Sequence, residues 1–121
     1  MPITRCNSAG FQILLGLALL IASIAMLSPK MTAELPFAHF DKLVHAASFL
    51  VLGFLADAGW PERGFVPAKY LSLLGYGIVI ECLQHYIPNR GFELLDILAD
   101  GGGLLLYGIA VLPLLRRAQI R

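Results

Sequence analysis

The chain has 121 residues, of which 58% are hydrophobic and only 14% are charged. Soluble domains carry about 25% charged residues, so this composition, with a mean hydropathy of +0.76, excludes an ordinary water-soluble protein and places the chain in lipid. The net charge of +1, without a basic tract interleaved with aromatic residues, excludes a nucleic-acid-binding protein. The length predicts one domain over residues 1–121.

In chain order, the first apolar run spans residues 11–27 and contains no charged residue. A secretory signal peptide, with cleavage near Ala25, is the alternative interpretation of this run. A polar segment leads to the second run, residues 43–58, which is short for a bilayer at about 1.5 Å per residue. We therefore expect Asp41 and Lys42 to form its first helical turn, at the membrane interface.

The third run, residues 70–87, is uncharged until Glu81, and the fourth, residues 94–115, is interrupted only by Asp96 and Asp100. All four runs are interpreted as helices, because lipid requires every backbone hydrogen bond to be satisfied within the segment. The sequence therefore predicts an all-α polytopic membrane protein, a bundle of four transmembrane helices.

Basic residues are distributed unevenly between the two sides that four spans define. The amino terminus, the 59–69 loop and the carboxyl terminus share one side and hold six Lys and Arg residues, whereas the 28–42 and 88–93 segments hold three. Because cytoplasmic segments are enriched in Lys and Arg, we expect both termini in the cytoplasm.

Most of the ionisable residues within the apolar runs fall at the helix ends on the opposite, outward-facing side. A charge that faces acyl chains costs at least about 2.5–3.5 kcal/mol, so we expect these side chains to turn toward one another. Gly103, on the helical face of Asp96 and Asp100, should permit close helix approach there. The candidate site residues are Asp41, Lys42, His45, Glu81, Gln84, Arg90, Asp96 and Asp100.

Several chemistries remain open for these residues. Glu81, Asp96 and His45 are candidate catalytic groups, since close carboxylates and a histidine can transfer protons. The candidate ligand-binding residues, with the two basic ones placed to contact an anionic group, are Asp41, Lys42, Gln84, Arg90 and Asp100.

Two further interpretations compete with these roles. A network of ion pairs that only holds the helices together is one of them. Metal binding is the other, but the order Glu81-x-x-Gln84-His85 matches no known metalloprotease arrangement, so no metal and no other cofactor is predicted. Gln12 and Asp57 are interpreted as interfacial residues without a role.

The ordered set Asp41-Lys42-x-x-His45, Glu81-x-x-Gln84, Arg90, Asp96 and Gly103 resembles the VanZ-like family, as do the surrounding segments DKLVHAASFLVLGFL and ECLQHYIPNRGFELLDILADGGG. The resemblance covers roughly residues 38–110 and departs at Asp100, where we would expect Asn in the family. It implies a small multi-pass protein of the bacterial cytoplasmic (inner) membrane, from a family associated with resistance to the glycopeptide teicoplanin.

Three functions therefore compete. In the first, the polar pocket binds or acts on the headgroup of a membrane lipid or a lipid-linked cell-envelope precursor. In the second, the protein is not an enzyme, and its polar layer holds its own helices or those of a partner. In the third, oligomers of the chain form a small transporter. The sequence leaves open the oligomeric state and whether a reaction is catalysed.

Overall fold

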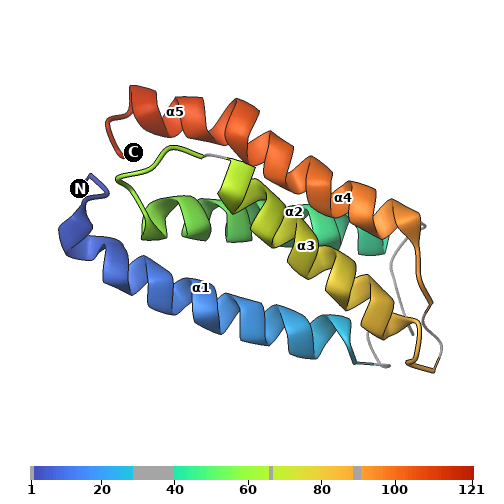
Figure 1. Ribbon diagram of the computed structural model, residues 1–121. Helices are drawn as coiled ribbons and strands as arrows, with labels where there is room; N and C mark the ends of the chain where they lie inside the picture. The colour runs from blue at the N-terminus through green and yellow to red at the C-terminus, as the bar shows by residue number, and fades with distance from the viewer. Residues whose placement is uncertain (1, 29–39, 66, 89–90) are drawn as a thin grey trace.

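A computed structural model describes residues 2–28, 40–65, 67–88 and 91–121. Within these ranges the chain is all-helical and forms four rods (Figure 1), which confirms the all-α part of the predicted fold class. The bounds of the helices are α1 Arg5–Met26, α2 Phe40–Gly59, α3 Pro67–Gln84, and a last rod built from α4 Leu94–Leu106, the π-helical η2 Tyr107–Val111 and α5 Leu112–Arg117.

Among the described residues, three rods are long and apolar enough to cross a membrane: α1, α2 and the rod Leu94–Arg117. These three support the prediction of a membrane protein. The third helix, α3, has 18 residues but carries Lys69 in its first turn and Glu81 and Gln84 in its last, which makes it less apolar than the others. Four spans therefore remain a prediction.

The first helix begins six residues before the apolar run that predicted it, because its amino terminus is capped by side chains. Asn7 Oδ1 accepts a hydrogen bond from the Thr4 backbone N–H at 2.8 Å, and Thr4 Oγ1 accepts one from the Cys6 N–H at 3.3 Å. These bonds satisfy polar groups that an uncapped helix end leaves unpaired. With 22 residues, α1 is about 33 Å long, enough for a hydrocarbon core of about 30 Å.

The core of the bundle surrounds α2, whose buried side chains pack against those of α1, α3 and α4. The backbones of α2 and α4 touch. A Cβ atom at Gly103 would lie only 2.1 Å from the Ala46 carbonyl oxygen, so only glycine fits at this crossing. Phe49 and Leu104 are fully buried beside it. α1 lies on the other side of α2, and α3 crosses in front of α2 in the view of Figure 1.

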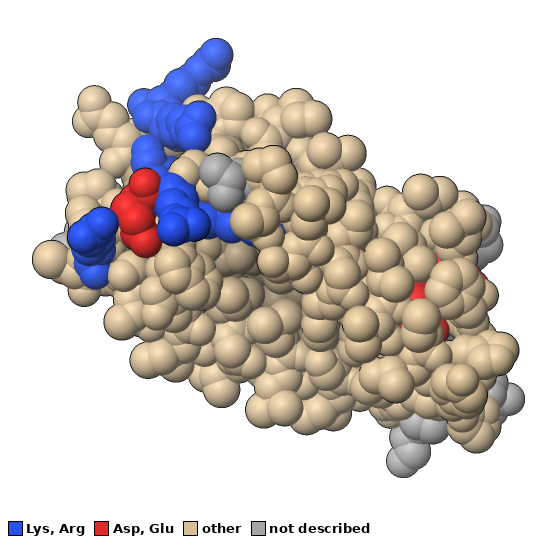
Figure 2. All heavy atoms as spheres, in the orientation of Figure 1, with Lys and Arg blue, Asp and Glu red and all other residues tan. Residues whose placement is uncertain are grey.

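The two ends of the bundle differ in what they gather. The amino terminus, the α2–α3 loop and the carboxyl terminus meet at one end, which we call the terminal end (Figure 1). Ile3 N donates to Ile120 O at 2.7 Å, and Gln12 Nε2 donates to Gly59 O at 2.7 Å. Figure 2 shows Lys and Arg side chains at the terminal end with acidic atoms among them, further acidic atoms at the opposite end, and a band with neither between the two ends.

Candidate functional site

Among the described residues, seven ionisable side chains from three separate segments meet at the end of the bundle opposite the termini. Five are carboxylates, and they face one lysine and one histidine. The first turns of α2 supply three residues, α3 supplies one, and α4 with its N-cap residue supplies the rest. We call this set the acidic cluster: Asp41, Lys42, His45, Glu81, Glu93, Asp96 and Asp100.

Helical spacing turns these side chains inward. Asp96 and Asp100 are four residues apart, and so lie on one face of α4. That face meets His45 on α2 and Glu81 on α3, as the predicted topology requires. His45 is 4% exposed, Glu81 0%, Asp96 5% and Asp100 1%. Ionisable groups this deeply buried need partners, since an unpaired buried charge is strongly destabilising.

The Lys42 ammonium group is surrounded by carboxylates. It forms ion pairs with Asp41 Oδ2 at 2.6 Å, with Asp96 Oδ1 at 3.1 Å, and with Glu93. Glu93 was not among the predicted site residues, because it lies in the turn before α4 and outside the family motif. These three pairs commit the Lys42 charge to the cluster itself, so the geometry does not favour the predicted contact of Lys42 with an anionic headgroup.

The His45 imidazole is oriented by Asp100. Its Nδ1 lies 2.7 Å from Asp100 Oδ1, and its Nε2 lies 3.7 Å from Asp96 Oδ2. A carboxylate acceptor at Nδ1 places the proton there and turns Nε2 toward Asp96 and Glu81. Gly77 makes room for Asp100, since a Cβ atom at Gly77 would lie 2.5 Å from Asp100 Oδ2. Asp100, the departure from the family pattern, therefore has a defined place.

Two carboxylate oxygens inside the cluster lack a hydrogen bond from any described residue: Glu81 Oε1 and Asp96 Oδ1. The Asp96 oxygen still has its ion pair with Lys42. The other Glu81 oxygen, Oε2, accepts a hydrogen bond from the Glu93 backbone N–H at 3.1 Å. Leaving a buried acceptor unsatisfied costs about 1–3 kcal/mol, so the free Glu81 oxygen marks the point where the cluster can accept something further.

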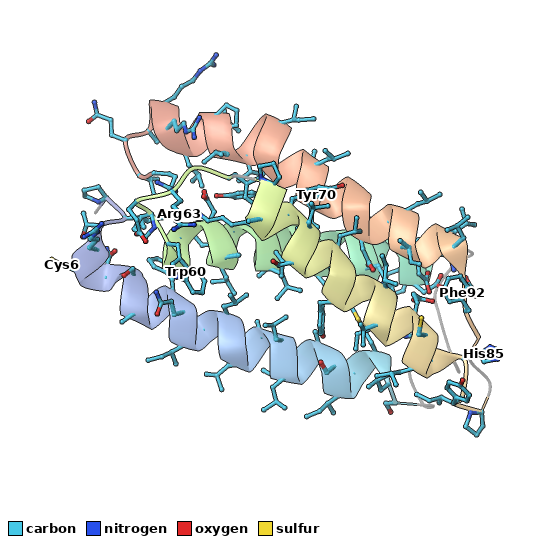
Figure 3. The ribbon with its side chains drawn as sticks, in the orientation of Figure 1. Cys6, Trp60, Arg63, Tyr70, His85 and Phe92 are labelled. Carbon is cyan, nitrogen blue, oxygen red and sulfur yellow. The ribbon has the colours of Figure 1, made fainter. Side chains whose placement is uncertain are left out.

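Two polar residues near the end of α3, Gln84 and His85, do not join the cluster. Gln84 is buried, but its Nε2 donates to the Met26 carbonyl at 2.7 Å and so ties the end of α1 to α3. His85 is exposed, packs edge-on against Tyr86, and points away from the bundle (Figure 3). Arg90 lies outside the described residues.

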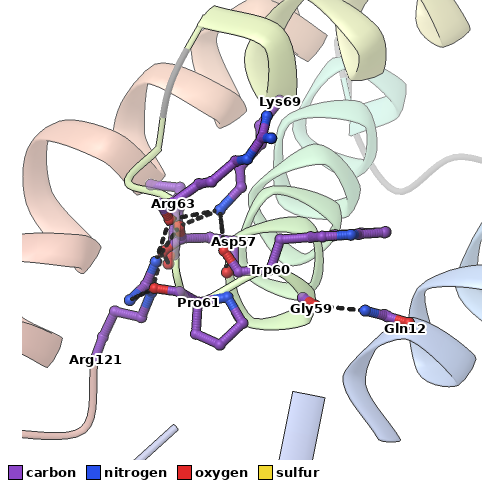
Figure 4. A network of polar contacts seen from close by, with 9 residues as sticks. Gln12, Asp57, Gly59, Trp60, Pro61, Arg63, Lys69 and Arg121 are labelled. Atoms are coloured by element: carbon purple, nitrogen blue, oxygen red, sulfur yellow. Dashed lines mark hydrogen bonds and ion pairs between the residues drawn. The ribbon is translucent and has the colours of Figure 1, made fainter. Parts of the chain in front are cut away.

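A second polar network, which sequence reasoning missed, lies at the terminal end around Asp57 (Figure 4). Asp57 is fully buried and hydrogen-bonded, so its interpretation as a residue without a role is wrong. Its Oδ2 accepts hydrogen bonds from Tyr107 at 2.6 Å and from Arg121 Nε at 2.9 Å, while Oδ1 accepts from Lys69 Nζ at 3.0 Å. A lone acid in an apolar run was the available signal, because such residues rarely face lipid.

An apolar cleft of about 560 Å³ also lies at the terminal end, away from the acidic cluster. Its lining residues include Leu15 and Leu19 of α1, Leu73 and Tyr76 of α3, and Trp60 of the α2–α3 loop. It shares no residue with the acidic cluster, and we do not assign it to the candidate site.

The chain matches no protein-family model, no curated protein and no solved structure. The VanZ-like resemblance therefore rests on the motif residues alone. The geometry of the acidic cluster is the evidence for the chemistry of the site.

Proposed function

We propose that the chain is a VanZ-like integral membrane protein of the bacterial cell envelope, which uses the acidic cluster to bind the headgroup of a membrane lipid or a lipid-linked envelope precursor. The observation that carries this proposal is the convergence of buried ionisable groups from three segments at one end of an otherwise apolar bundle. Such groups are costly in a membrane and mark functional sites. Apolar side chains would hold the same helices at a smaller desolvation cost.

The proposed topology places this end at the outer face of the cytoplasmic membrane. In this topology α3 also crosses the membrane, which makes four spans in total, and both termini are cytoplasmic. Its support is the concentration of basic side chains at the terminal end, which fits the enrichment of Lys and Arg on the cytoplasmic side. These side chains are Arg5, Arg63, Lys69, Arg116, Arg117 and Arg121.

In the proposed site, Glu81, Asp96 and His45 contact the headgroup, and proton transfer by these three stays a prediction. Asp100 orients His45 through its 2.7 Å hydrogen bond. Asp41 positions Lys42 in the same way, at 2.6 Å. These two acids therefore act through their neighbours.

A structural role is the second candidate, and one observation favours it. Lys42 has three carboxylate partners and His45 has Asp100, so most of the acidic cluster is paired within the bundle. If the cluster serves only to hold helices, replacing Glu81 by Gln should change stability without affecting any specific ligand response.

A thermal-shift experiment separates the two candidates. The detergent-purified protein is melted with phospholipids, polyprenyl phosphates and cell-wall precursors. A ligand at about 100 times its Kd should stabilise by roughly 2.7 kcal/mol. Glu81→Gln should lose the response of the wild type, and Glu62→Gln, which removes an exposed charge at the terminal end, should keep it. No shift with any lipid class, whether or not a divalent cation is present, or an equal shift in both variants, would refute the binding proposal.

A further inference from the structure

We propose that His45, Glu81 and Asp96 form a binding site for a divalent metal ion of the Zn²⁺ or Mn²⁺ type. The sequence motif order did not predict it, because the three ligands come from three different helices. The site does not depend on whether the acidic cluster binds a lipid headgroup, and each proposal can fail without the other.

The three side chains offer one imidazole nitrogen and two carboxylate oxygens that all lie within 4.8 Å of one another. His45 Nε2 and Asp96 Oδ2 are 3.7 Å apart. Ligand atoms that share an ion at about 2.1 Å each can be at most roughly 4.2 Å apart. Small side-chain movements therefore close the triad around one ion.

Glu81 provides a second observation that points to a ligand. The residue is fully buried, and one of its carboxylate oxygens is fixed by the Glu93 N–H at 3.1 Å. The other, Oε1, has no hydrogen-bond donor among the described residues. A buried carboxylate held at one oxygen and free at the other is prepared to coordinate, and an ion would remove the cost of its unsatisfied acceptor.

The groups behind the ligands fit a metal site as well. Metal-binding histidines usually donate their other ring N–H to a carboxylate, which fixes the ring and its tautomer. Asp100 occupies this position at His45 Nδ1, so the Nε2 lone pair faces the triad. Lys42 holds the second ligand in a comparable way, because it lies 3.1 Å from Asp96 Oδ1.

Charge favours a cation over other occupants. Among the described residues, the five carboxylates of the cluster face one ammonium group, Lys42, and the His45 imidazole, which is neutral when its Nε2 binds a metal. A mixed set of one imidazole and two carboxylates suits Zn²⁺ or Mn²⁺ better than soft, thiolate-seeking ions. Three protein ligands leave at least one coordination position for water or an exogenous oxygen. The competing occupant is a proton shared by Glu81 and Asp96, which would need no metal.

The test uses the full chain, purified in detergent and freed of metal with a chelator. It is titrated with Zn²⁺ by calorimetry and with Mn²⁺ by electron paramagnetic resonance, with Mg²⁺ as the comparison ion. We expect one ion per chain. Glu81→Gln and His45→Gln should weaken binding at least about tenfold, and Asp100→Asn about 10–100-fold.

Glu93→Gln is the matched control. It removes the same charge from the same cluster, but Glu93 supplies no ligand to the proposed triad, so the affinity should change by about fivefold or less. Glu93 does belong to a second possible cation group, with Asp41 and Asp96. The Lys42 ammonium forms ion pairs with all three of those acids. If Glu93→Gln abolished binding and Glu81→Gln did not, the proposed triad would be wrong.

A spectroscopic measurement on the unmodified protein keeps the proposal testable if a variant fails to fold. Coupling of the bound Mn²⁺ electron spin to an imidazole nitrogen is expected, since His45 is a ligand. Absence of that coupling, or absence of stoichiometric binding of either ion, overturns the proposal and favours the shared proton. The lipid panel has its own readout, so a negative result there leaves the metal result standing.

Discussion

Replacing Asp57 by Asn should loosen the terminal end of the bundle. Both carboxylate oxygens are in use, and Arg121 binds them with two nitrogens, at 2.9 and 3.0 Å. Removing one charge from a buried pair costs about 3–5 kcal/mol, because the partner is left uncompensated. Lys69 and Arg121 keep backbone carbonyl acceptors in the α2–α3 loop. We therefore expect the lower end of this range, about 3 kcal/mol.

The melting temperature of the detergent-purified protein measures this loss, and about 3 kcal/mol corresponds to a fall of roughly 10 °C. The double variant Asp57→Asn/Arg121→Gln should be more stable than the sum of its singles predicts, because both remove the same interaction. Glu62→Gln, an exposed change in the same loop, should stay within about 0.5 kcal/mol of wild type. If Asp57→Asn melts with the wild type, helix packing alone fixes this end and the reasoning from the buried ion pair is wrong.

Two further predictions concern packing and orientation. Gly103→Ala should prevent stable folding, because its Cβ would lie 2.1 Å from the Ala46 carbonyl oxygen. Gly102→Ala is the control: its Cβ would meet nothing within 4 Å, so the melting temperature should stay unchanged or rise slightly. A membrane-impermeant maleimide applied to intact cells tests the proposed orientation. It should spare a variant that keeps Cys6 as its one cysteine, and it should label a variant whose only cysteine replaces Tyr86, an exposed residue at the end opposite the termini. The reverse pattern would place the termini outside the cytoplasm.

The helices and their meeting point could be predicted because lipid leaves few choices. An apolar run must be helical, and consecutive spans alternate in direction, so the end of one helix adjoins the start of the next. Asp41 and Lys42 in the first turn of α2 follow from this logic, and the structure confirms that placement. The juxtaposition of Glu81 with Asp96 follows from it too, since the short 85–93 connection brings the end of α3 to the start of α4.

The pairing within each network could not be predicted, because it depends on rotation of the helices and on contacts between distant residues. Asp57 and Arg121 are 64 positions apart, and no local pattern links them. The pairing of His45 on α2 with Asp100 on α4 depends on a third helix, α3, where Gly77 leaves space for the Asp100 side chain. Helix α1 begins before its apolar run because of a Thr4 cap, a local signal that hydropathy does not contain.

The charge of the acidic cluster constrains which headgroup it can bind. With Lys42 already paired to three acids, a phosphate would enter next to uncompensated carboxylates. Two like charges at 4 Å repel by about 4 kcal/mol at an effective dielectric constant near 20. A divalent ion would turn this repulsion into attraction, because metal ions held by carboxylates commonly complete their coordination with phosphate oxygens.

If both proposals hold, a phosphorylated headgroup should therefore stabilise the metal-loaded protein but not the metal-free one. A cationic headgroup would do the opposite and compete with Mn²⁺, so repeating the lipid panel with and without the metal identifies the sign of the charge that the site accepts.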